Sequence, residues 1–166
     1  NWMPINQIFS FHLYFTTFSD TGGAQPFNNV QDYDNWLTRV NAFIPWLETA
    51  QSNMREGMTN NVVLPKAIIE KVLGQMGQFT NPDTESHVFY APIKNMTAEL
   101  SQEDRDRLDN AFRELIDTKL RPAYLELEKF LKEEYLPVGT ETAGIGALPY
   151  GQETYQYLVK YHTSTN

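Results

Sequence analysis

Large apolar side chains recur every three or four residues along much of this chain, and this spacing constrains its fold more than any other feature. The clearest run comprises Tyr33, Trp36, Leu37, Val40, Ile44 and Leu47. Because an α-helix turns once in about 3.6 residues, these side chains form one face of a helix and are expected to be buried together. Similar stripes follow Pro65, Ser101 and Pro122. The sequence therefore predicts several amphipathic helices.

Prolines and glycines predict where these helices bend or end. Pro45 and Pro122 lie inside apolar stripes, where a missing backbone donor and a ring clash predict a kink or a new helix. Gly57 and Gly77 are expected at helix ends. Asn-Gly turns and alternating β-branched runs are absent from the sequence, so strands are not expected. We predict a single all-α domain over residues 1–166, an irregular array of about six to eight helices, several kinked at proline.

Composition limits the chemistry that the chain can perform. The net charge is −8, and an acidic surface repels phosphate backbones, so nucleic acid is not expected as a partner. The chain has no cysteine, which excludes disulfides, zinc–thiolate sites and thiol nucleophiles. No apolar run approaches the roughly 18 residues that a membrane span requires.

Titratable residues are plentiful but do not form a recognisable catalytic motif. The three histidines, His12, His87 and His162, are far apart in the sequence, and none is followed by glutamate, so the metal-binding pattern H-E-x-x-H is absent. We expect His12 and His87 to be structural, whereas His162 lies in the aromatic final segment and is a binding candidate. The glutamates between residues 126 and 134 lie along one predicted helix among Lys129 and Lys132, as on a solvated helix face. The residues alone predict neither a metal site nor a catalytic residue in this chain.

Arg55 has two interpretations. It follows an apolar stripe and precedes Gly57, and the simpler interpretation places its charge favourably near the negative end of a helix dipole. Its guanidinium is also suited to anchor a carboxylate through two parallel hydrogen bonds. Arg55 is therefore a candidate substrate-binding residue.

The stretch "GIGALPYGQETYQYLVKYHTSTN", from Gly144 to the end of the chain, is the strongest candidate for binding. Its glycines permit close approach of backbone to another segment or to a ligand. Tyr155 and His162 are seven residues apart, so they share a face of a continuous helix, predicted from about Gln152 to Tyr161. The alternative is a tight loop that docks an amphipathic helix on the body of the domain.

Five segments carry a resemblance to a known family. They are "MPINQ", "DYDNWLTRVNAFIPWL", "MREGMTNNVVLPKAIIEKVLGQM", "RPAYLELEKFLKEEYLP" and "GALPYGQETYQYLVKYHTST". In this order they resemble the middle of bacterial proteins grouped as domain-of-unknown-function family 885, many of which are described as lipoproteins. The resemblance spans nearly the whole chain. It implies a helical protein several times longer, so the chain is expected to be a fragment whose main partner is the remainder of the parent chain.

The resemblance also implies a chemistry for the parent protein. Family members carry, further along, an H-E-x-x-P-G-H motif similar to that of zincin metallopeptidases, in which two histidines hold zinc and the glutamate activates water. That motif is absent from this sequence, so zinc is expected in the parent and no cofactor in the fragment. Gly144, Tyr155, His162 and Thr163 match family positions and are expected to line a substrate groove.

These observations leave two main functional hypotheses. The first is the groove-forming part of a bacterial zinc-dependent peptidase-like protein, catalytically incomplete by itself, with a peptide as substrate. The alternative is a non-catalytic helical binding or scaffold module of an exported lipoprotein; a third hypothesis, a general all-α interaction domain, ignores the resemblance. The resemblance favours the bacterial envelope or periplasm. A fragment is expected to expose apolar surface and to self-associate through it.

Overall fold

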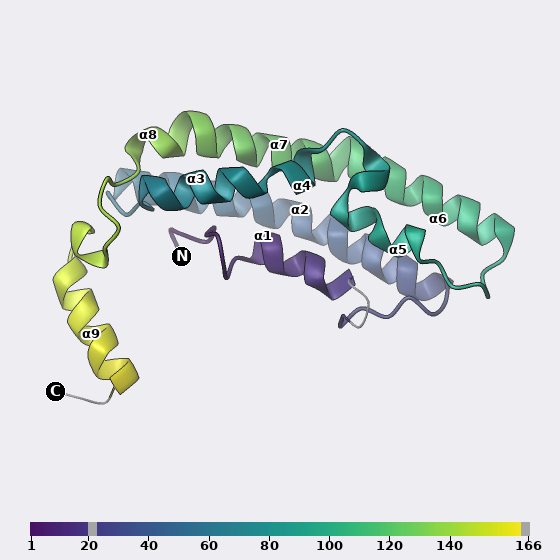
Figure 1. Cartoon of the computed structure of the whole chain (residues 1–166), viewed down its shortest axis with the longest axis horizontal. Coiled ribbons are helices and arrows are strands. Elements are labelled where there is room, and N and C mark those ends of the chain that lie inside the picture. The colour runs from purple at the N-terminus through teal and green to yellow at the C-terminus, as the bar shows by residue number, and fades with distance from the viewer. Residues whose placement is uncertain (20–22, 164–166) are drawn as a thin grey trace.

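A computed structural model describes residues 1–19 and 23–163, and its regular structure is helical (Figure 1). The α-helices are α1 (Phe11–Tyr14), α2 (Val30–Thr59), α3 (Lys66–Gln75), α4 (Gly77–Thr80), α5 (Ala91–Lys94), α6 (Gln102–Leu115), α7 (Arg121–Phe130), α8 (Leu136–Val138) and α9 (Gly151–Thr163). Short 3₁₀ turns are η1 (Phe15–Ser19), η2 (Thr84–Ser86), η3 (Val88–Tyr90) and η6 (Ile145–Ala147), and wider π turns are η4 (Ile116–Leu120) and η5 (Leu131–Tyr135). The prediction of an all-α chain is confirmed.

Three long helical stretches form the body of the domain (Figure 1). Helix α2 runs along its length, α3 and α4 return in the opposite direction, and the continuous stretch from α6 to α8 runs beside α2 in the same direction. Three polar contacts mark this parallel pairing from one end to the other: Arg107 to Asp34 at 3.0 Å, Lys119 to Asn41 at 3.2 Å, and Arg55 to Glu134 at 2.8 Å.

Side-chain caps fix where two of these helices begin. The side chain of Asn29 accepts a hydrogen bond from the backbone N–H of Asp32 at the start of α2, and Ser101 does the same for Asp104 at the start of α6. Each cap satisfies a backbone donor that has no partner inside the helix. The predicted helix start at Ser101 is confirmed.

The prolines act differently at different positions. Helix α2 runs through Pro45 to Thr59 without a new start. Before Pro122, in contrast, the backbone N–H of Arg121 bonds to the carbonyl of Ile116, five residues earlier. The same widened turn precedes Pro137. Because a proline ring crowds the carbonyl four residues before it, the preceding turn opens by one residue and the helix continues.

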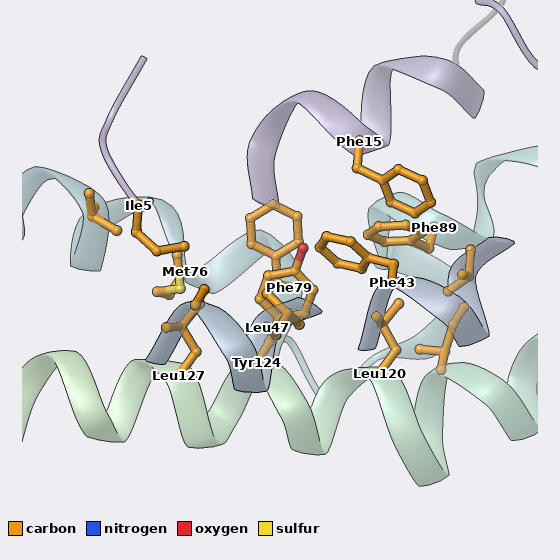
Figure 2. Close-up of a cluster of buried hydrophobic side chains, with 14 of the residues drawn as sticks. Ile5, Phe15, Phe43, Leu47, Met76, Phe79, Phe89, Leu120, Tyr124 and Leu127 are labelled. Carbon is orange, nitrogen blue, oxygen red and sulfur yellow. The ribbon is translucent and has the colours of Figure 1, made fainter. Parts of the chain in front are cut away.

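The core lies between α2, the α6–α8 stretch and the segments α1, η1, α4 and η3, and it is rich in aromatic rings (Figure 2). Phe15 stacks on Phe43 with ring centroids 4.6 Å apart, and Phe79 stacks on Tyr124 at 4.3 Å. Leu127 packs nearby and is fully buried. Burial of each such large apolar side chain contributes about 1.5–3 kcal/mol to the stability of the fold. Packing against this core therefore holds the N-terminal segment in place.

Helix α9 stands apart from this body (Figure 1). Its packing is mainly with η6, in the loop that precedes it, and Gly151 is its buried residue. The predicted span from about Gln152 to Tyr161 agrees with the observed helix, Gly151–Thr163. Most side chains of α9 therefore face solvent.

Candidate functional site

The predicted site residues fall in three separate places. Arg55 lies near the end of α2, Gly144 lies in the loop before α9, and Tyr155, His162 and Thr163 lie on α9. The structure thus brings the residues of α9 onto one element but does not place Arg55 with them.

Arg55 forms a two-pronged contact with Glu134 across the two parallel helices. Its Nε and Nη2 donate to the two carboxylate oxygens, both at 2.8 Å. Its guanidinium also lies over the ring of Phe130, 4.5 Å from the centroid. The hydrogen bonds from Arg55 lower the pKa of Glu134 and raise the pKa of Arg55. Arg55 therefore holds a carboxylate, as its chemistry suggested, but one that this chain itself supplies.

A groove runs beside this ion pair, between α2 and the helix that contains η4 and α7; we call it the α2/α7 groove. Its volume is about 630 Å³, and Ile44, Pro45, Pro122 and Ala123 supply its apolar lining. This size lies in the range of small-ligand sites, about 300–1,000 Å³.

Polar residues complete the α2/α7 groove. Lys119 donates to Asn41 at 3.2 Å, and Arg55 and Glu134 pair further along. Glu48 from α2 and Glu126 from α7 also line the groove, as does Gln51, which is only 8% exposed. These last three residues carried no signal in the sequence, because a glutamate or glutamine on a helix is ordinarily solvated.

Gly144 borders a second, smaller and more apolar hollow, which we call the loop pocket. It measures about 360 Å³ and is lined by residues such as Leu64, Ile68 and Leu148. A Cβ at Gly144 or Gly146 would meet no atom within 4 Å, so these glycines are not needed for close packing. Gly151 is needed, because a Cβ there would lie 1.9 Å from the carbonyl oxygen of Ile145.

Tyrosine side chains and one histidine cover the outer surface of α9. Tyr155 is 59% exposed and Tyr161 is 69% exposed. Tyr161 stacks on Tyr157, with centroids 6.1 Å apart, and meets the ring of His162 edge-on at 5.0 Å. Thr163 donates to the carbonyl of Val159 at 2.6 Å. The helix thus presents phenol and imidazole groups that can bind a polar or aromatic ligand.

The other two histidines are structural, as predicted. His87 donates from Nε2 to the carbonyl of Phe79 at 2.9 Å and accepts at Nδ1 from the backbone of Phe89 at 3.3 Å. His12 is fully buried and bonds through Nδ1 to the hydroxyl of Ser10. Burial lowers the pKa of both imidazoles, that of His12 to about 4.

The described residues do not fit a zinc ion. Within residues 1–19 and 23–163, no group of three histidine, aspartate or glutamate side chains is placed to hold a metal. Both nitrogens of His87 are engaged, and His162 lies on the exposed surface of α9. We therefore assign no metal ligand among these residues.

A polar network that the sequence did not predict secures the segment η2–η3 against the α6–α7 stretch. Arg121 donates to the carbonyl of Asn81, to Asp117 and to Thr84, at 2.8, 2.6 and 2.9 Å. Arg113 similarly contacts Glu85, 28 residues away in the sequence. These arginines hold a long connection in place and are assigned a structural role.

Comparisons with known proteins give a consistent result. Residues 2–166 match a family model described as "Bacterial protein of unknown function (DUF885)". A solved structure described as "the putative lipoprotein from Colwellia psychrerythraea" superposes with a TM-score of 0.84 at 21% sequence identity. The match covers 99% of this chain but 29% of that one, so the chain spans less than a third of its length. No curated protein matches the chain.

None of the described helices combines the length and the apolar character that crossing a bilayer would require.

Proposed function

The chain belongs to the bacterial family DUF885, and from this premise we propose that its helical body forms one side of a substrate groove in a longer envelope protein. The similar structure from Colwellia psychrerythraea, more than three times as long as the match, supports the greater length, and its description as a lipoprotein supports the envelope location. The reactive centre of the longer protein would then lie outside these residues.

The observation that carries this proposal is the exposure of α9. A helix of 13 residues is marginal in water when it has no tertiary packing. Tyr155, Tyr157 and Tyr161 nevertheless leave most of their ring surface in solvent, and Leu158 is only partly buried. Contact with the remainder of the longer protein, or with a bound substrate, would bury this surface and stabilise the helix.

The residues of α9 suggest what such a groove would bind. Phenol hydroxyls accept and donate hydrogen bonds, and their rings pack on apolar side chains. An extended peptide offers both kinds of partner, which makes a peptide the best-supported substrate class. Tyr155 and His162 are proposed to bind and orient it, with Gly144 in the adjoining loop and Thr163 at the end of the helix. The resemblance implies that a zinc ion held elsewhere would supply the hydrolytic chemistry.

The experiment is a peptidase assay on the longer protein with Tyr155→Phe and with His162→Ala. Because these residues would contact substrate, we expect KM to rise several-fold while the fold is unchanged. Tyr14→Phe is the matched control, since Tyr14 is equally exposed (58%) but lies on α1. Activities of both α9 variants equal to that of the wild type would overturn their assignment.

A non-catalytic binding or scaffold module of an exported lipoprotein is the second candidate. The scattered placement of the predicted site residues and the internal pairing of Arg55 favour it. The two candidates differ in a direct way: only the first predicts peptide hydrolysis by the longer protein that stops when a chelator removes zinc.

A further inference from the structure

A short stretch near the start of the chain presents large apolar side chains to solvent. Phe9 is 90% exposed, Ile8 63% and Tyr14 58%, and Phe11 is exposed as well. We call these four residues the N-terminal patch. Residues 1–19 contain no aspartate, glutamate, lysine or arginine. Exposed rings in a stretch without these charges are typical of the centre of an interface, where charged residues are depleted and aromatic residues enriched.

Hydrogen bonds and a ring contact fix the backbone that carries this patch. The Oδ1 of Asn6 accepts from the backbone N–H of Ile8 at 2.9 Å and from that of Phe9 at 2.8 Å, and its Nδ2 donates to the carbonyl of Phe9 at 3.0 Å. Phe11 meets Trp46 edge-on, with ring centroids 5.2 Å apart. A segment that is already ordered loses little entropy on binding. The turn therefore presents Phe9 as an aromatic anchor, the kind of residue that fills a hollow on a partner.

The patch and α9 lie toward the same region. The N-terminal segment runs along one side of the body, and α9 projects from one end of the body toward that same side (Figure 1). The two enclose an open angle (Figure 1). Most side chains of α9 are exposed as well. A single packed unit seated in this angle would contact both surfaces.

The length of the similar solved structure points to the occupant. The match covers 99% of this chain and 29% of that one, so more than two-thirds of that protein lies outside the matched part. Segments of one polypeptide meet at a high effective concentration, so an interface of a few apolar side chains is enough to keep them together. A second copy or a lipid surface would have to be bound without this advantage.

We propose that the N-terminal patch docks an apolar surface in the remainder of the longer protein, with the ring of Phe9 as the anchor, and that the same unit covers α9. This inference rests on the proposed function for the longer protein. It goes beyond that function because it assigns a second contact surface, on residues 8–14, that is separate from the substrate-binding residues. Contacts at both places would fix the remainder against α9.

Hydroxyl-radical footprinting of the longer protein, read by mass spectrometry, tests the proposal. We expect the ring of Phe9 to be oxidised at least tenfold more slowly in the longer protein than in the 166-residue chain, because docking removes it from solvent. Leu125 is the matched control, since it is 47% exposed on α7, a helix on the other side of the body from the N-terminal segment (Figure 1). It should be oxidised at similar rates in both proteins. Equal rates for Phe9 in both would overturn the proposal.

The variant Phe9→Ser tests the anchor itself. The ring is 90% exposed in the chain, so its loss should leave the Tm of the 166-residue chain unchanged. In the longer protein the same change should lower the Tm by about 2 °C or more, because a docked ring is removed. Leu125→Ser is the control and should have the same effect in both proteins. An unchanged Tm of Phe9→Ser in the longer protein would refute the anchor.

The outcomes separate this proposal from the proposed function. Slow hydrogen exchange of residues 151–163 in the longer protein, together with freely oxidised Phe9, would overturn the docking of the patch and leave the groove on α9 standing. Protection of Phe9 only when phosphatidylcholine vesicles are added would assign the patch to a membrane surface. Protection only at concentrations where the longer protein dimerises would assign it to a second copy, and either result would overturn the proposal. Protection of Phe9 in the monomer without vesicles would support it.

Discussion

Protonation of His12 should destabilise the folded protein in mild acid. The Ser10 hydroxyl donates to the carbonyl of Pro4 at 3.1 Å, so the short contact between Ser10 and His12 requires a proton on Nδ1 of the imidazole. The other nitrogen, Nε2, is buried and has no partner among the described residues. A second proton would therefore place a charge on a nitrogen that no acceptor faces. Burial accordingly lowers the pKa of His12 from 6.5 to about 4.

The magnitude follows from this pKa difference. Between pH 6.5 and about pH 4 the unfolded chain binds a proton at His12 that the folded protein does not bind, so the free energy of unfolding falls as the pH falls. The loss from this one group is about 2 kcal/mol at pH 5 and about 3 kcal/mol at pH 4, and it is negligible above pH 7. That is a large share of the roughly 5–15 kcal/mol by which domains are stable.

Urea denaturation from pH 7.5 to pH 4, for the wild type and for His12→Phe, measures this effect. Phenylalanine has a similar shape and cannot be protonated, so the difference in unfolding free energy between the two proteins should change by about 3 kcal/mol over that range. Other titrating groups are common to both proteins and cancel in the difference. Leu125→Ala, a change at an exposed residue without a titratable group, is the control and should leave the slope unchanged. Parallel curves for the wild type and His12→Phe would refute the reasoning.

Three further predictions concern packing. Leu127→Ala should lower the free energy of unfolding by about 2–5 kcal/mol in urea denaturation, because it leaves a cavity in the core. Arg55→Met should cost less than about 1 kcal/mol by the same measurement, since the Arg55–Glu134 pair is half exposed and the methionine still covers nearby apolar surface; a cost equal to that of Leu127→Ala would contradict this. Gly151→Ala should destabilise the protein by about 1–3 kcal/mol and loosen α9, seen as faster hydrogen exchange there, because the new Cβ collides with the carbonyl of Ile145; unchanged exchange would show that the loop adapts.

The helices were predictable from the sequence because burial imposes a 3.6-residue period on each of them. Trp36, Val40 and Leu47 are all buried on the inner face of α2, as their spacing indicated. The effect of proline was less predictable. Helix α2 passes through Pro45, whereas the turn before Pro122 widens, and no local pattern in the sequence distinguished these two outcomes.

The candidate site was less predictable than the fold, because it depends on contacts between distant segments. Arg55 and Glu134 are 79 residues apart, and no local pattern links them. Glu48, Glu126 and Gln51 share a groove only because two parallel helices place them at the same level. The placement of Tyr155 and His162 on one helix was predictable, since it depends on the local period alone.

Helix α9 and the loop before it are, in the proposed function, completed by the remainder of a longer protein. Hydrogen–deuterium exchange of the backbone amides between residues 151 and 163 tests this claim most directly, when the 166-residue chain is compared with the longer protein under the same conditions. We predict rapid exchange in the chain and strong protection in the longer protein, because buried helices open far less often than exposed ones. Equally rapid exchange in both would contradict the claim.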